Sequence, residues 1–186
     1  AKPYDRLPVD ISPPMVDILY ATDRQPSDTH FLHPVFYGND RSLSLSLGRA
    51  HVRFGDDDLS WSEFEQASFS QHRSREVPLQ IERIEELGSL GAAEELLEES
   101  IRSPNKATDR FIAAIQSRLS RCAEKDIYVF VPGFKVDFAY PVLVAAELWH
   151  YMGYPGAFMA YSWPSRQRLR DYLMDVETTA FTAQHF

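Results

Sequence analysis

The segment from residue 126 to residue 165 constrains the fold more than any other part of this chain. Five consecutive apolar residues, Ile127 to Val131, lie between Lys125-Asp126 and the turn-forming pair Pro132-Gly133. An unbroken apolar run of this length predicts a strand that is buried on both faces, as in parallel sheets. Apolar side chains then recur at helical spacing, and a second apolar strand is predicted over residues 157–161. The helical set is Val142, Ala145, Ala146, Trp149 and Met152, and the turn after it is Gly153-Tyr154-Pro155-Gly156. The segment therefore predicts a β-α-β unit.

Two short segments directly follow the two predicted strands. Gly133 to Lys135 comes after the first strand, and Ser162 to Ser165 comes after the second. The strands of a β-α-β unit are parallel, and ligands of such sheets bind at the carboxyl ends of the strands. We therefore expect both segments at one edge of the sheet, and we expect this edge to be functional.

The front of the chain has a different pattern. Four prolines in residues 1–14 predict an extended lead-in or a tether. Strands are predicted over Met15–Ala21, Ser44–Phe54 and Val77–Ile84, with the second of them antiparallel and a loop over residues 25–39. The order of patterns therefore predicts antiparallel strands first and the parallel unit afterwards.

Three further helices are predicted around the central strand. Two apolar stripes precede it, separated by Pro104-Asn105, and a third helix is predicted over residues 167–183. The stripes are Ala93, Leu96, Leu97 and Ile101 in one helix, and Ile112, Ile115, Leu119 and Cys122 in the other. A right-handed crossover after the strand at 157–161 leads to another parallel strand. We therefore expect residues 15–186 to be the front portion of a larger domain.

Charge and hydropathy exclude several function classes. The net charge is −8 and the pI is near 5.2, whereas nucleic-acid binding needs clustered Lys and Arg. We predict no nucleic-acid partner. No apolar run has the length of a membrane span, and no secretory signal is visible, so the sequence predicts a soluble chain without a transmembrane segment.

Conspicuous polar side chains outside the β-α-β unit have simple interpretations. His30 and His33 lack a third ligand at metal-binding spacing, which favours a solvated loop over a metal pair. Residues 56–58 are three aspartates without the interleaved spacing of a calcium loop, which favours an exposed turn. Cys122 lies on an apolar helical stripe and is interpreted as a core residue. We predict no metal site and no cofactor.

Four segments in order resemble a bacterial family of α/β-hydrolases. They are residues 16–24, 37–49, 129–134 and 162–165, and the family is described as esterase- or lipase-like, under the label domain of unknown function 900. The resemblance spans the chain from Val16 to about Glu177. It implies an α/β-hydrolase-like mixed sheet, with antiparallel N-terminal strands followed by the parallel β-α-β unit.

The resemblance also implies site residues. The turn after the strand at 127–131 is expected to supply a backbone N–H to an oxyanion hole, with Phe134 and Lys135 as the donors. The family usually has His-Gly-Phe-Asn where this chain has Pro132-Gly133-Phe134-Lys135. Because Pro132 has no N–H and a fixed φ, it cannot make the hydrogen bonds of that histidine. The expected rim of the pocket is formed by Gly133, Ser162, Trp163 and Ser165.

The nucleophile that the resemblance implies is not in these residues. No serine of the chain lies in a Gly-x-Ser-x-Gly pattern, which presents the nucleophile of such hydrolases. The family places that serine on the next strand, after Phe186, and places the acid and the histidine later. The sequence therefore predicts the N-terminal part of a serine hydrolase of carboxylic esters, inactive by itself. Its expected partners are a small acyl ester and the remainder of the same domain or a second chain.

Two further expectations follow from the same resemblance. The alternative function is a binding or scaffold module that has kept the fold and lost catalysis, for which Pro132 is the supporting feature. In the family's sheet order the strand at 127–131 lies beside the nucleophile strand, so we expect an open apolar edge there. Relatives are often exported or lipid-anchored, which is compatible with a tether in residues 1–14.

Overall fold

The computed structural model describes residues 14–27, 36–56, 58–69, 77–91 and 106–165. The elements in chain order are β1 (Met15–Pro26), β2 (Tyr37–Phe54), α1 (Trp61–Phe69), β3 (Leu79–Leu90), α3 (Lys106–Arg121), β4 (Ile127–Phe130), α4 (Ala139–Tyr151) and β5 (Ala157–Ser162). The predicted β-α-β unit is confirmed as β4-α4-β5. The helices predicted over residues 93–101 and 167–183 lie outside the described residues.

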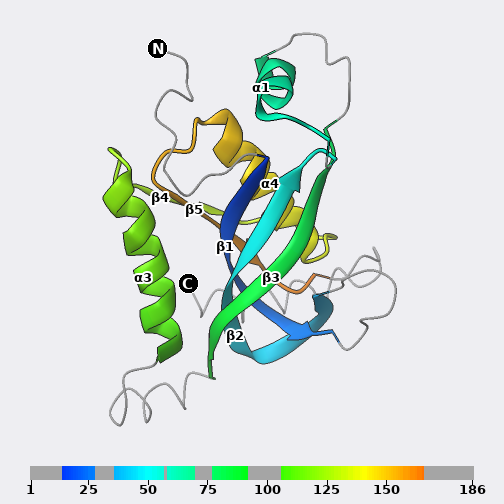
Figure 1. Ribbon diagram of the computed structural model, residues 1–186. Helices are drawn as coiled ribbons and strands as arrows, with labels where there is room; N and C mark the ends of the chain where they lie inside the picture. Colours follow the sequence, from blue (N-terminus) through cyan, green and yellow to red (C-terminus); the bar gives the residue numbers. More distant parts are fainter. Residues whose placement is uncertain (1–13, 28–35, 57, 70–76, 92–105, 166–186) are drawn as a thin grey trace.

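The strands form one mixed sheet in the order β3-β2-β1-β5-β4 (Figure 1). β1 pairs with β2, and β2 with β3, in antiparallel fashion, whereas β5 is parallel to both β1 and β4. The expected α/β fold is therefore confirmed, with antiparallel strands from the front of the chain and a parallel unit after them. Within the described residues, no helix is long and apolar enough to cross a membrane.

The first three strands are longer than their hydrophobic patterns predicted. β1 continues to Pro26 and β2 already begins at Tyr37, so both strands extend into the predicted loop, and β3 continues to Leu90. The reason is cross-strand pairing, because Arg24 lies opposite Arg41 and Pro26 lies opposite Tyr37. Backbone pairing can thus extend a strand through polar residues that carry no apolar alternation.

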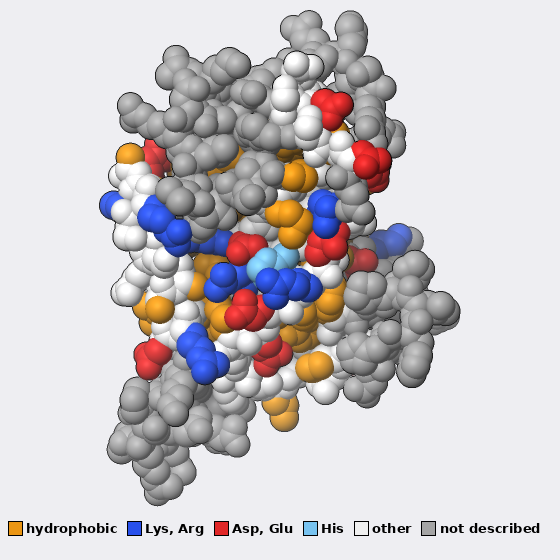
Figure 2. All heavy atoms as spheres, in the orientation of Figure 1, with side chains coloured by type: hydrophobic (Ala, Val, Ile, Leu, Met, Phe, Trp, Pro, Cys, Tyr) orange, Lys and Arg blue, Asp and Glu red, His pale blue; other side chains and the backbone are white. Residues whose placement is uncertain are grey.

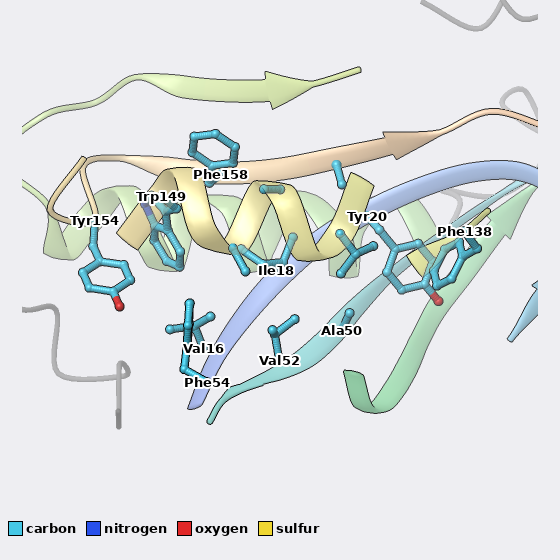
Figure 3. Packing of buried hydrophobic residues seen from close by; sticks show 14 of the residues in the cluster. Val16, Ile18, Tyr20, Ala50, Val52, Phe54, Phe138, Trp149, Tyr154 and Phe158 are labelled. Atoms are coloured by element: carbon cyan, nitrogen blue, oxygen red, sulfur yellow. The ribbon is translucent and has the colours of Figure 1, made fainter. Parts of the chain in front are cut away.

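One face of the sheet packs against α4 and forms the main core (Figure 3). Ile18 of β1 and Val52 of β2 are fully buried, and so are Val142 and Ala146 on the facing side of α4. Burying an aliphatic side chain of this size stabilises a fold by about 1.5–3 kcal/mol. The helical spacing therefore identified a core helix at four of its five positions, whereas Met152 follows the helix and is 46% exposed.

The other face of the sheet packs against α3. Leu19, Leu47 and Leu87 of the first three strands contact a cluster that includes Phe111 of α3 and Trp163. The predicted apolar stripe of this helix is wrong at Ile112, which is 44% exposed, whereas Phe111 and Arg118 are buried. The helix contacts the sheet through a face that also carries a cation, and such a face has no purely apolar signature.

β4 lies at the end of the described sheet and is not buried on both faces, so that prediction was wrong. Alternate residues Ile127, Val129 and Val131 are 49%, 45% and 46% exposed, whereas Tyr128 and Phe130 pack against the core. Among the described strands, β4 pairs only with β5. Among the described strands, β4 therefore ends the sheet, and one of its faces carries exposed apolar side chains.

The sequence analysis missed helix α1, which follows β2. Its start is a capping box: the Ser60 N–H donates to Glu63 Oε2 at 2.9 Å, and the Glu63 N–H donates to Ser60 Oγ at 3.3 Å. Phe64, one residue further, is buried against Phe54 of β2. The Ser-x-x-Glu spacing before Phe64 is the signal that could have predicted this helix.

Candidate functional site

The carboxyl ends of β4 and β5 meet at one edge of the sheet, as expected. The Trp163 indole Nε1–H, after β5, donates to the Pro132 carbonyl, after β4, at 2.9 Å. Ser165 Oγ accepts from the Val136 N–H and donates to the Val136 carbonyl, each at 3.1 Å. The segment after β5 therefore holds both ends of the turn after β4.

The middle of this turn is open to solvent. Gly133, Phe134 and Lys135 are exposed, and no atom lies within 4 Å of the position where a Cβ on Gly133 would stand. Lys135 has a φ of 69°, a left-handed conformation that is uncommon for a residue with a side chain. Within the described residues the Lys135 N–H has no hydrogen-bond partner. The turn therefore presents backbone amide groups at the carboxyl edge of the sheet.

The expected rim residues after β5 are buried. Ser162 and Ser165 have no exposed surface, and Trp163 is 7% exposed. Ser162 Oγ accepts a hydrogen bond from Arg24 at 3.0 Å, and its carbonyl accepts one from the Thr22 hydroxyl at 2.5 Å. These side chains hold neighbouring groups in place through hydrogen bonds, whereas Gly133, Phe134 and Lys135 of the turn are exposed.

Arg24, at the end of β1, is the residue that connects this edge, and the sequence analysis gave it no role. Its guanidinium is fully buried. Its Nε–H donates to Ser162 Oγ at 3.0 Å. One terminal nitrogen donates to the Gly38 carbonyl at 3.1 Å and to Asn39 Oδ1 at 2.8 Å. The other terminal nitrogen donates to the Val136 carbonyl at 2.8 Å. A planar guanidinium with several fixed donors can bind such spread acceptors at once. Arg24 thereby joins β1, the start of β2, the turn after β4 and the end of β5.

The neighbouring residue Asp23 is also buried, and it forms an ion pair with Arg41 at 3.1 Å. Two consecutive buried charges at a strand end are costly unless each is compensated. Here Asp23 has a cation and Arg24 has neutral acceptors from three segments. A buried Asp-Arg pair directly after an apolar strand is the signal by which sequence reasoning could have found this cluster.

A second polar cluster lies on the α4 face and resembles a nucleophile with its base. His150 Nε2 is 2.8 Å from Ser68 Oγ, and His150 Nδ1 is 2.7 Å from the Tyr154 hydroxyl. Ser68 Oγ also donates to the Phe64 carbonyl at 2.8 Å. With that proton already used, the imidazole Nε2–H donates to Ser68 Oγ and Nδ1 accepts from Tyr154. In this arrangement His150 is not oriented to remove the Ser68 proton.

The surroundings of His150 also argue against catalysis. Burial lowers the pKa of His150 to about 4, which makes the imidazole a weak base at pH 7. The adjoining hollow, between Phe64, Val77 and Tyr151, has a volume of about 30 Å³. This is enough for a water molecule and too small for an ester substrate. The cluster is a satisfied polar group in the core.

Metal binding has no support in the described part of the chain. No group of three or more His, Cys, Asp or Glu side chains comes together there. His30, His33 and Asp57 lie outside the described residues. Cys122 is half-buried and lies in neither core cluster of the described residues, so its interpretation as a core residue was wrong; its Sγ–H donates to the Gly156 carbonyl at 3.4 Å.

Comparison with known protein families gives a match in the second part of the chain. Residues 107–186 match the family model described as Alpha/beta hydrolase of unknown function (DUF900). The matched range includes the turn at Gly133–Lys135 and the segment Ser162–Ser165. No curated protein and no solved structure matches the chain. The resemblance is therefore confirmed: over residues 107–186, this chain matches the alpha/beta hydrolases of unknown function (DUF900).

Proposed function

We propose that residues 15–186 form the front portion of a serine hydrolase that cleaves carboxylic esters. In this proposal the chain supplies the oxyanion turn, and a strand from outside these residues supplies the nucleophile. The observation that carries it is the solvent-open turn Gly133–Lys135, held at the carboxyl edge of the sheet by Arg24, Trp163 and Ser165. The match to a hydrolase family over the same residues supports it.

The turn has the donor that the chemistry requires. When a serine attacks an acyl carbonyl, the carbonyl oxygen becomes an anion, and backbone N–H groups placed about 2.7–3.1 Å from it lower the barrier. The Lys135 N–H has no partner among the described residues, and the residue is exposed in a left-handed turn. We assign Lys135, with Phe134 as its neighbour in the turn, to this role.

The proposed reaction follows the acyl-enzyme scheme. A histidine takes the proton of the serine hydroxyl as the new C–O bond forms, and it then gives that proton to the leaving alcohol. Water repeats the sequence and releases the acid. The described residues contribute oxyanion stabilisation and positioning, and each lost oxyanion donor is expected to reduce kcat by about 10²–10³.

Pro132 takes part in positioning the turn. It has no N–H, but its carbonyl accepts the Trp163 indole N–H, and the residue itself is buried. The fixed φ of proline and this hydrogen bond together restrict the backbone just before Gly133. The proline at this position is therefore compatible with an organised oxyanion turn.

The exposed side of β4 supports the proposal that the strand carrying the nucleophile pairs with β4. Its backbone edge has no partner among the described strands, and Ile127, Val129 and Val131 leave apolar surface beside it. A parallel strand paired there would end at the same edge as the turn, because parallel strands share their carboxyl edge. A serine at the end of that strand would lie next to Gly133–Lys135.

Fluorophosphonate labelling of the natural protein tests this proposal. We expect one adduct by intact mass, located by peptide mapping on a serine outside residues 1–186, together with hydrolysis of short-chain p-nitrophenyl esters. Residues 15–186 alone should take no label. This control tests whether Ser68, which lies within these residues, reacts with the fluorophosphonate. Absence of both adduct and hydrolysis in the natural protein would favour the non-catalytic binding module. An adduct on Ser68 would contradict the proposal that the reaction takes place at the carboxyl edge of the sheet.

A further inference from the structure

A hollow of about 390 Å³ lies between α3 and the sheet face formed by β1, β2 and β3. On this side of the molecule, acidic and basic side chains gather around a histidine over the strands (Figure 2). The hollow shares no residue with the carboxyl edge described above. Its lining includes the apolar residues Leu19, Leu87, Ala113 and Ala114, and the other lining residues are polar or charged.

The lining of this hollow is strongly basic in an acidic protein. Arg49 of β2 and Arg110, Arg118 and Arg121 of α3 line it, against Glu85 as the one acidic residue of the described lining. The chain as a whole carries a net charge of −8. Arginines that converge from two elements into one concavity create a local positive potential, and low-dielectric walls strengthen it.

Two of the four arginines are fixed by contacts with the protein. Arg118 is 7% exposed, donates to the Asp17 carbonyl, and lies with its guanidinium 5.0 Å from the centre of the Trp149 ring. Arg121 donates from Nε to the Ser117 carbonyl at 3.0 Å and from a terminal nitrogen to Ser117 Oγ at 2.6 Å. These contacts fix the two guanidinium groups at the wall of the hollow, and the groups named here that make them carry no negative charge to neutralise the guanidinium groups.

The other two arginines have hydrogen-bonding capacity left. Arg49 is 3.5 Å from Asp17 and 3.8 Å from Glu85, distances beyond a good hydrogen bond, and its buried Nε has no hydrogen-bond partner. Arg110 is exposed and forms no ion pair or hydrogen bond within the described part of the chain. A buried N–H without a partner is unfavourable, so an oxyanion that accepted it would be stabilised there.

We propose that this hollow binds an organic phosphate monoester. Guanidinium groups bind phosphate oxygens through several N–H donors, and both Arg49 of β2 and Arg110 of α3 line the hollow. The hollow is larger than an inorganic phosphate, and Leu19, Leu87 and the two alanines Ala113 and Ala114 offer apolar surface to the organic group. The ligand class is thus a small phosphate ester with an apolar substituent.

Titration of the natural protein with phenyl phosphate and with inorganic phosphate tests this site. We expect saturable binding of phenyl phosphate by calorimetry at low salt, with a Kd of about 1 mM or tighter, and weaker binding of inorganic phosphate. Arg110→Gln and Arg49→Gln should each weaken it about tenfold, because each loses charge-assisted hydrogen bonds. Added sodium chloride should weaken it further.

The matched control is Arg83→Gln, which removes one positive charge from an exposed position of β3 outside the hollow. It should leave the affinity for phenyl phosphate unchanged. Equal weakening by Arg83→Gln, or no saturable binding of phenyl phosphate, would overturn the proposal. Fluorophosphonate labelling should be the same in Arg110→Gln as in the unmodified protein, so failure of this site is distinguishable from failure of the hydrolase proposal.

Discussion

Arg24 shows how one side chain can organise the edge on which the proposed chemistry depends. Its acceptors come from residues as far apart in the sequence as Gly38 and Ser162, and the guanidinium has no contact with solvent. A buried charged group of this kind is costly unless all its donors are used. Loss of any one of the three acceptor segments therefore affects the other two.

Arg24→Lys is expected to destabilise the protein by about 3 kcal/mol, because an ammonium cannot reach the spread acceptors and leaves a buried charge poorly paired. Chemical denaturation measures this loss. Amide hydrogen exchange over residues 133–136 should accelerate more than exchange in the α4 core. The control is Arg53→Lys, at an exposed ion pair with Glu82, which should cost less than about 1 kcal/mol. Equal effects of the two variants would contradict the role of Arg24.

His150 makes stability depend on pH. Its pKa in the folded protein is about 4, because burial disfavours the imidazolium, against about 6.5 in the unfolded chain. Between these values the unfolded state binds more protons, so stability is full above pH 6.5 and falls as pH decreases toward 4. The loss due to this group is on the order of 3 kcal/mol.

Urea unfolding of the natural protein and of His150→Gln at pH 7 and pH 4.5 measures this contribution. The variant should be less stable at pH 7 and should lose less stability on acidification. Ser68→Ala, which removes one hydrogen-bond partner and leaves the imidazole buried, is the control. The same pH dependence in His150→Gln as in the unmodified protein would show that other groups cause it.

At the scale of elements, the β1-β2 hairpin depends on one close approach. A Cβ at Gly48 of β2 would lie 2.4 Å from the ring and hydroxyl of Tyr20, its partner on β1. Tyr20 is fully buried, its hydroxyl is 3.2 Å from that of Tyr37, and burial raises the pKa of Tyr37 to about 12. The tyrosine pair therefore remains neutral in the core and requires glycine opposite it.

Gly48→Ala is expected to reduce the free energy of unfolding by about 1–3 kcal/mol, because the methyl group overlaps a ring that has no room to move. Gly38→Ala, where the nearest atom would be 3.7 Å away, should be close to neutral. Thermal and chemical denaturation of both variants give the comparison. A stable Gly48→Ala protein would mean that Tyr20 can adopt another rotamer.

The position of β4 at the end of the described sheet leads to a prediction about self-association. An unpaired strand with exposed apolar residues is a site for pairing with another chain. Residues 15–186 alone should therefore self-associate, and Val129→Lys should reduce this, as measured by light scattering after size exclusion. Ile112→Lys, at an exposed position of α3, is the control for added charge. A monodisperse monomer of the unmodified residues 15–186 would refute the prediction.

At the scale of the whole molecule, the two faces of the sheet differ in character: one is apolar and the other carries charged side chains. α4 and α3 lie on opposite faces of the sheet (Figure 1). α4 covers an apolar core, whereas the arginine-lined hollow lies between α3 and the strands β1, β2 and β3. The carboxyl edge, with the turn at Gly133–Lys135, lies apart from both. The proposed hydrolase site and the proposed phosphate site can therefore be tested independently.

The sequence by itself determined the β4-α4-β5 unit, the turns on both sides of α4 and the absence of a Gly-x-Ser-x-Gly serine. These features depend on periodicity and turn residues that are close together in the chain. The sequence also contains two signals that the sequence analysis did not use: the Ser60-x-x-Glu63 spacing before α1 and the Asp23-Arg24 pair after an apolar strand. Short-range patterns therefore gave the elements and their order.

Only the tertiary structure decided which side chains meet at the two sites. The apolar run at 127–131 predicted a buried strand, but its place at the end of the described sheet leaves one side exposed. Arg24 reaches Ser162 across 138 residues, and Arg49 faces Arg110 and Arg121 from another element. Exposure and charge convergence depend on neighbours that are distant in the chain, and no local pattern contains them.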